Sequence, residues 1–362
     1  MRVAWQIGAA AAVVGAVAVG LALALPGDDG RSPPASGGAL FSRDSPWNRP
    51  ASTHGKPVRV PRSWIGDFNG ENGDPLGIER SWEQGKAVFQ ARRSDPKDAT
   101  FRLAPASQCF DDPNGCRSFQ PEDPDQIVRP DGSGSPDRIP IPRDVRCPGL
   151  PKVDDDHDRA LVVISADRKT AWEFWHCTHV ATRSEPWYTA AVATRWDLDA
   201  HGNRPANSGY QDEQLTGDGS PSARGSGTPL VITTITPSEA LRGIDHAIGL
   251  TVNEVDDRWV NPPASHSDGC RGCSHLRYGM LFVLDPKFDV PGDATPLERN
   301  VAAALKRYGA YVVDRGPLFE LDGSPNEPKQ PSSSAELWNL AGGGDLGGLG
   351  IQPSDLRYVP TQ

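Results

Sequence analysis

The residues best suited to chemistry gather between Asp154 and His179. Asp156 and His157 stand in a carboxylate-rich turn, and Glu173 stands among aromatic residues of a strand-like run. A carboxyl group among aromatic side chains loses contact with water, so its pKa rises and it suits a general acid. A histidine titrates near neutral pH and suits proton abstraction. These residues predict acid–base chemistry, although a turn cap and a cross-strand ion pair are plain alternatives.

Three polar residues further along the chain complete the predicted site. Asp197 ends a strand-like run, His246 lies in IDHAIGLTVNEV, and His266 lies in PPASHSDGCRGCSH. Two carboxylates beside a glycosidic bond act as acid and base or nucleophile, and their separation decides retention or inversion. A core histidine and a surface histidine are the plain interpretations of His246 and His266. We expect a catalytic site only if the fold brings together Asp156, His157, Glu173, Asp197, His246 and His266.

Tryptophans surround the predicted site in the sequence. Trp172, Trp175 and Trp196 offer flat apolar faces on which sugar C–H groups could stack. A row of aromatic residues also fills the core of many β proteins. We predict a substrate-binding role for these three tryptophans, with core packing as the alternative.

The six cysteines form an even set, which favours disulfides in an oxidising compartment. Two pairs are close in sequence and indicate local bridges, which leaves a third pair. The preferred set, among fifteen possible connectivities, is Cys109–Cys116, Cys270–Cys273 and Cys147–Cys177.

A zinc site is the alternative for the second of these pairs. His266, Cys270, Cys273 and His275 have a spacing that could offer four ligands. Structural zinc sites more often contain a second C-x-x-C, which this chain lacks. We therefore favour the disulfide and expect no metal and no other cofactor.

Several other classes of function lack their motifs in this sequence. There is no Gly-x-Ser-x-Gly elbow, no P-loop and no Gly-x-Gly-x-x-Gly after a strand. The chain has 37 basic and 47 acidic residues, a net charge of −10, and no basic stripe interleaved with aromatics. Nucleotide and nucleic-acid partners are not expected.

The elements that must position these residues are mostly strands. Frequent Gly and Pro, with short apolar runs between them, favour many strands joined by turns. Leu161–Ile164 is entirely apolar, which predicts a central strand. Helix-start patterns occur at Thr236 and Thr295, each followed by Pro and then by Glu at the third helical position. We predict a mainly β fold, a jelly-roll or β-sandwich with one or two short helices.

The N-terminus predicts export. An uncharged apolar run extends from Val3 to Gly27, so residues 1–27 are a signal peptide or a membrane anchor. We expect a linker at 28–40, a single β-rich extracellular domain at 41–330, and a C-terminal tail at 331–362 packed on that domain. Contact with a membrane is expected only through the N-terminal segment.

The C-terminal half resembles a group of uncharacterised secreted bacterial proteins that are β-rich and extracellular. The shared motifs include DHDRALVVISADRKTAWEFW, Trp196-Asp197, TPLVITTITPSEALRGIDHAIGLTV, PPASH, LRYGMLFVLDP and ALKRYGAYVVDRGPLFELDG, in this order between Asp154 and Gly323. Asp158-Arg159 and the CRGC insertion depart from the pattern. The resemblance implies an extracellular, glycan-associated protein and carries no established catalytic residues.

Together these observations predict an extracellular carbohydrate-active protein. A hydrolase or lyase acting on a polysaccharide or cell-wall glycan through carboxylate and histidine groups is the first hypothesis. A non-catalytic glycan-binding or cell-envelope structural protein is the alternative. A convergence of titratable side chains would favour an enzyme, and a flat aromatic platform without them would favour a binding module.

Overall fold

A computed structural model of the chain describes residues 39–69, 73–82, 84–95, 101–103, 127–128, 134–135, 139, 141, 145–148, 158–175, 177–181, 186–190, 192–202 and 223–360. Asp156, His157, the Cys109–Cys116 pair and the predicted N-terminal segment 1–27 lie outside these residues. Within them, no helix combines the length and the apolar character needed to cross a membrane.

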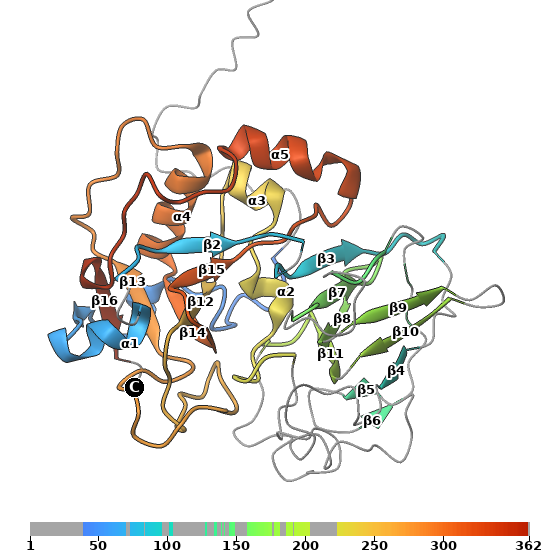
Figure 1. Cartoon of the computed structure of the whole chain (residues 1–362), viewed down its shortest axis with the longest axis horizontal. Helices are drawn as coiled ribbons and strands as arrows, with labels where there is room; N and C mark the ends of the chain where they lie inside the picture. The colour runs from blue at the N-terminus through green and yellow to red at the C-terminus, as the bar shows by residue number, and fades with distance from the viewer. Residues whose placement is uncertain are drawn as a thin grey trace, which may run out of the picture. The chain divides into compact units, whose positions relative to one another are not determined.

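A seven-stranded mixed sheet forms the larger part of the fold (Figure 1). β12 pairs in parallel with β14 and antiparallel with β15, so the centre of the sheet is neither purely parallel nor purely antiparallel. The strands, in their order across the sheet, are β1 (Val58–Arg59), β16 (Leu356–Val359), β13 (Leu281–Leu284), β14 (Ala310–Arg315), β12 (Ile248–Val252), β15 (Glu320–Asp322) and β2 (Gly77–Glu79).

Helices pack against one face of this sheet through a large apolar core. The longest, α4 (Pro296–Arg307), begins at Thr295, whose side chain accepts from the Glu298 N–H while the Glu298 carboxylate accepts from the Thr295 N–H. α3 (Pro237–Arg242) begins with the same capping box at Thr236, so both predicted helix starts are confirmed. α1 (Ile65–Asn69) and α5 (Ser334–Ala341) also contribute to this core.

The predicted central strand and the predicted strand that carries Glu173 form a hairpin in the middle of a six-stranded sheet. β7 (Leu161–Ile164) pairs with β8 (Thr170–Trp175) and in parallel with β3 (Ala87–Gln90). Every residue of β7 is buried, as expected for a strand covered on both faces. The other strands of this sheet are β11 (Val192–Asp197), β5 (Ile127–Val128) and β6 (Gly134–Ser135), and a separate three-stranded sheet contains β4 (Phe101–Leu103), β10 (Pro186–Ala190) and β9 (Thr178–Ala181).

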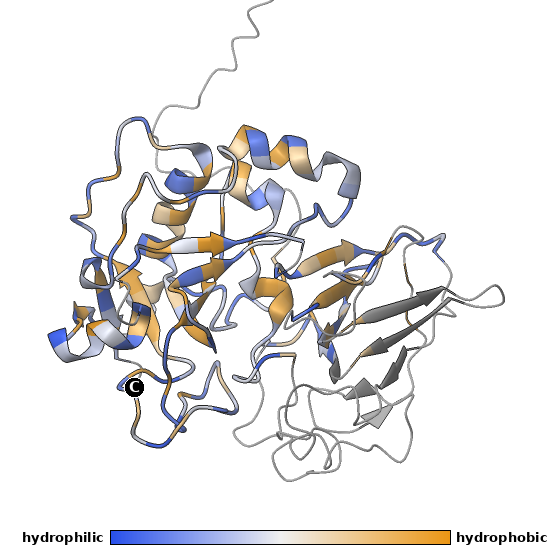
Figure 2. Cartoon of the chain, in the orientation of Figure 1, coloured by the Kyte–Doolittle hydropathy of each residue, from blue (hydrophilic) through white to orange (hydrophobic). Residues whose placement is uncertain are grey.

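A second apolar core joins the seven-stranded sheet to the hairpin. It contains Val162 of β7, Val313 of β14 and most of α2 (Leu230–Thr233). Hydrophobic residues dominate α2, β3 and β7 (Figure 2). The segment Pro229–Ile235 has the β-branched composition typical of a strand, yet complete burial of α2 between the two sheets stabilises a short helix instead.

The fold is therefore mainly β, with mixed sheets and few short helices. The described residues contain five short α-helices rather than the expected one or two, because caps at Thr236 and Thr295 and burial of α2 and α5 stabilise helical turns. Across the same residues the sheets do not close into a barrel.

Candidate functional site

A row of polar side chains crosses β14, β12 and β15 on one face of the seven-stranded sheet. Asp314 pairs with Thr251, and Thr251 pairs with Glu320. Directly paired residues in neighbouring strands point to the same face, so the two carboxyl groups flank Thr251. A β-bulge after Leu250 places Asp314 opposite Thr251. Such bulges re-aim side chains and are frequent beside active sites.

A buried arginine links this row to a second carboxylate of β15. Arg224 Nη1 lies 3.0 Å from Asp314 Oδ2, and Nη2 binds Asp322. Asp322 follows Glu320 by two residues and shares its face of the strand. Burial alone would lower the pKa of the Arg224 guanidinium, but the charges of Asp322 and Asp314 outweigh it, so that pKa is raised. Arg224 therefore remains a cation that orients both carboxylates.

The second sheet contributes an ion pair. Lys86 Nζ, just before β3, lies 2.5 Å from Asp158 Oδ2, just before β7. The indole N–H of Trp175 donates to Asp158 Oδ1 at 3.1 Å. Burial alone would lower the pKa of Lys86, but Asp158, Asp322 and Asp314 raise it. We call this set the Arg224 cluster: Lys86, Asp158, Arg224, Asp314, Glu320 and Asp322.

The Arg224 cluster contains more carboxyl groups than cations, and the pKa values of its carboxyl groups are shifted in different directions. Burial raises the pKa of Asp314 to about 6, against the opposing charges of Arg224 and Lys86. Burial, reinforced by the charges of Asp322 and Glu79, raises the pKa of Glu320 to about 7. For Asp158 burial also acts upward, but Lys86 brings the pKa down to about 2. Two carboxyl groups thus exchange protons near neutral pH.

Accessibility distinguishes the members of the cluster. The Asp314 side chain is 26% exposed, whereas that of Asp322 is 5% exposed and that of Arg224 is fully buried. Glu320 is partly exposed. Asp314 and Glu320 are therefore the carboxyl groups of this row that a ligand could reach. Asp322 is buried, and the buried Arg224 binds both Asp314 and Asp322.

Glu173, the predicted general acid, is fully buried on β8. Its Oε1 accepts from the Val231 N–H at 2.8 Å, and its Oε2 accepts from the Trp196 indole N–H at 2.8 Å. Its negative charge adds to those that hold Arg224 protonated. Glu173 therefore connects β8 with β11 and α2, and it lies next to the Arg224 cluster. Direct proton transfer from Glu173 to a substrate stays a prediction.

The three predicted substrate-binding tryptophans lie in or near the core. Trp196 is 1% exposed, and Trp172 is also buried. Trp175 is partly exposed and binds Asp158. In this conformation only Trp175 offers part of its ring to a ligand, and it does so beside the Arg224 cluster.

Asp197 and His246 form local contacts away from that cluster. Asp197, exposed at the end of β11, accepts from the Asp199 N–H at 2.9 Å and caps a turn. His246 Nε2 lies 3.2 Å from Glu239 Oε1, the residue that also caps α3. Burial alone would lower the pKa of His246, but its bond to Glu239 raises it. This pair anchors α3 to the start of β12.

His266 lies beside the segment that carries Arg224. Its backbone N–H donates to Ser226 O at 3.3 Å, and the N–H of Ser265 donates to the same oxygen at 3.0 Å. The His266 ring is buried, with its centroid 6.4 Å from that of Trp259. Of the four predicted catalytic residues that the structure describes, Glu173 and His266 are therefore the two that lie near Arg224.

None of the Arg224 cluster was among the site residues predicted from the sequence. Asp158 directly follows the predicted Asp156-His157 pair, and Asp314 directly follows the apolar run AYVV of β14. Both positions were visible in the sequence as carboxylates at strand ends. Arg224 stands in a Gly- and Ser-rich segment, and Asp314 and Asp322, which it binds, follow it by 90 and 98 residues, so no sequence pattern identifies it.

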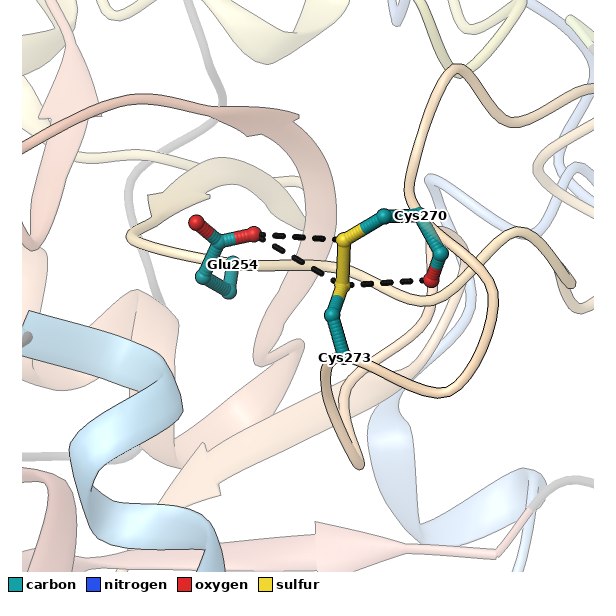
Figure 3. Close-up of side chains that lie close together, drawn as sticks. All are labelled: Glu254, Cys270 and Cys273. Carbon is teal, nitrogen blue, oxygen red and sulfur yellow. Dashed lines mark hydrogen bonds between the residues drawn. A yellow bond between two sulfur atoms is a disulfide. The ribbon is translucent and has the colours of Figure 1, made fainter.

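Two of the three predicted disulfides are present, Cys147–Cys177 and Cys270–Cys273. The zinc alternative used His266 and His275 as ligands. His275 instead binds Asp67, with Nδ1 to Oδ2 at 2.9 Å, while the buried His266 lies against Trp259. Glu254 is the residue beside the two sulfur atoms (Figure 3).

Comparison with known proteins adds no assignment. No family model matches this chain, and no curated protein or solved structure matches it.

Proposed function

We propose that this chain is an extracellular carbohydrate-active enzyme that hydrolyses a polysaccharide or cell-wall glycan by acid–base chemistry at the Arg224 cluster. The observation that carries the proposal is the Asp314 carboxyl group, which is partly exposed, bound to a buried arginine, and has a pKa of about 6. Perturbed carboxyl groups beside a specific charge partner are typical of functional sites. Asp314 and Glu320 are the proposed proton-transfer pair.

Their spacing supports hydrolysis with inversion. Two strand spacings of about 4.8 Å separate the Asp314 and Glu320 Cα atoms by about 9.6 Å. Inverting glycosidases hold their carboxyl groups about 6.5–9.5 Å apart to leave room for the attacking water, whereas retaining enzymes hold them about 5–5.5 Å apart. This Cα separation is closer to the first range than to the second, so inversion is the outcome we propose.

The pKa order assigns the roles. Glu320, with a pKa of about 7, keeps its proton longer and would protonate the leaving oxygen. Asp314, with a pKa of about 6, ionises first and would accept a proton from water. Arg224 binds Asp314, and the charge of Lys86 also favours its ionised form. Trp175, bound to Asp158 of the same cluster, offers a partly exposed aromatic edge for a sugar ring.

Export remains part of the proposal, supported by the apolar N-terminal sequence and by the two disulfides. A jelly-roll or sandwich arrangement of the sheets also stays a prediction. Among the described strands, parallel pairs occur at β3–β7, β12–β14, β2–β15, β4–β10 and β5–β11, whereas both architectures are mainly antiparallel.

The test is a screen of the chain on purified polysaccharides, with new reducing ends and unsaturated sugar products measured separately. On a responsive glycan, Asp314→Asn and Glu320→Gln are each expected to lower kcat/KM about 10²–10⁴-fold, the usual contribution of a general acid or base. Glu336→Gln, exposed on α5, is the control and should leave the rate unchanged.

Proton NMR of the first product resolves its anomeric form, and inversion is expected. Unsaturated products would indicate that the same site cleaves the glycan by elimination and not by hydrolysis. Glycan binding without any product, equal in wild type and in both variants, would contradict an enzyme and favour the non-catalytic alternative.

A further inference from the structure

The loop between β12 and β13 places three potential metal ligands together, and none of them belongs to the Arg224 cluster. Glu254 Oε2 lies 3.6 Å from Cys270 Sγ and 3.7 Å from Cys273 Sγ. Among the described residues, Glu254, Cys270 and Cys273 form the group of three potential metal ligands whose carboxylate and sulfur atoms all lie within 4.8 Å of one another. The carboxylate points at the sulfur pair (Figure 3). Both cysteines are exposed, so a small reductant and an ion can reach them.

The loop keeps its shape through bonds that do not need the disulfide. The Cys270 N–H donates to Val255 O at 3.2 Å, and the Ser274 hydroxyl donates to Glu254 O at 2.9 Å. The buried Asp256 accepts from the Gly272 N–H at 2.9 Å. Reduction would leave both thiols beside Glu254.

Charge then favours a cation at this position. Two thiolates and one carboxylate would repel one another at this distance. The nearby arginines are engaged with other carboxylates, Arg258 with Asp256 and Arg271 with Asp257. A divalent ion with affinity for sulfur would neutralise all three groups. Zn²⁺ accepts Cys and Glu ligands, and three protein ligands with one open position are a known zinc geometry.

We propose that Cys270, Cys273 and Glu254 form a redox-controlled site for a divalent, sulfur-binding metal ion such as Zn²⁺. In the disulfide form the two sulfur atoms are bonded to each other and the site is closed. A dithiol reductant transfers two electrons and two protons, which breaks the S–S bond, gives two thiols and leaves the reductant as a disulfide. Metal binding then releases the two thiol protons and forms two metal–sulfur bonds.

The experiment uses the full chain with Cys109→Ser and Cys116→Ser, so that only the two observed pairs remain. Mild reduction with a dithiol is followed by intact mass, which should show one reduced pair, because Cys177 is fully buried and Cys270 and Cys273 are exposed. Co²⁺ is then titrated as the probe. We expect sulfur-to-cobalt charge-transfer absorption that saturates at one ion per chain and is displaced by Zn²⁺.

Matched variants separate the ligands from the surrounding charge. Glu254→Gln should weaken Co²⁺ binding by at least about tenfold, whereas Asp257→Asn, a carboxylate of the same loop that faces Arg271, should leave it unchanged. Charge-transfer absorption in the unreduced protein, or its persistence after Cys270→Ser and Cys273→Ser, would overturn the site. Reoxidation by a small disulfide with no cobalt–sulfur absorption would overturn it too, and would indicate thiol–disulfide exchange instead.

Discussion

At the scale of single residues, Glu173 and Asp314 show how burial separates two carboxyl groups that look alike in sequence. Both lie on apolar strands. Glu173 is fully enclosed and gives both oxygens to N–H donors of Val231 and Trp196, so its contribution is to the fold around α2. Asp314 binds one arginine and keeps 26% of its side chain exposed, so it is available to a ligand.

Glu173→Gln is expected to destabilise the protein by about 1–3 kcal/mol. Glutamine supplies one acceptor oxygen where the structure has two buried donors, so its amide N–H would face the Val231 or Trp196 N–H. Urea unfolding measures the change in the free energy of unfolding, with the exposed Glu336→Gln expected within about 0.5 kcal/mol of wild type. Equal stability of the two variants would show that these two bonds contribute little.

At the scale of elements, α2 shows that packing between the sheets can outweigh the conformation that local composition favours. Its β-branched residues favour a strand, but the space between the sheets accepts a compact helical turn. Gly249 of β12 makes room for that turn, because a Cβ there would lie 2.8 Å from Thr233 Cβ and 2.9 Å from Val313 Cγ2. Helices α3 and α4 were predictable because their capping boxes are written in consecutive residues.

Gly249→Ala should therefore cost about 1–3 kcal/mol through overpacking. Thermal and urea unfolding would measure the loss. Gly66→Ala is a suitable control, since a Cβ at that helical position meets no atom within 4 Å. An unchanged free energy of unfolding for Gly249→Ala would mean that α2 is free to move away from β12.

At the scale of the whole molecule, the mainly β character, the central strand β7 and two disulfides followed from the sequence, whereas the Arg224 cluster did not. Arg224 is 90 residues from Asp314 and 98 from Asp322. Their meeting depends on the strand order β14–β12–β15 and on a β-bulge, which no local pattern encodes. Apolar runs, helix caps and cysteine spacing can each be recognised from residues that are close together in the sequence. Long-range charge pairing is specified only by the completed sheet.

The most direct test of the central claim is the pH dependence of kcat/KM on a responsive glycan. Below about pH 6 Asp314 takes up a proton and is lost as a base, and above about pH 7 Glu320 loses its proton and is lost as an acid. We predict a narrow bell-shaped profile with a maximum between these values. In Asp314→Asn the residual activity should lack the acidic limb and in Glu320→Gln the alkaline limb. Profiles of both variants that keep the wild-type shape would contradict proton transfer by this carboxyl pair.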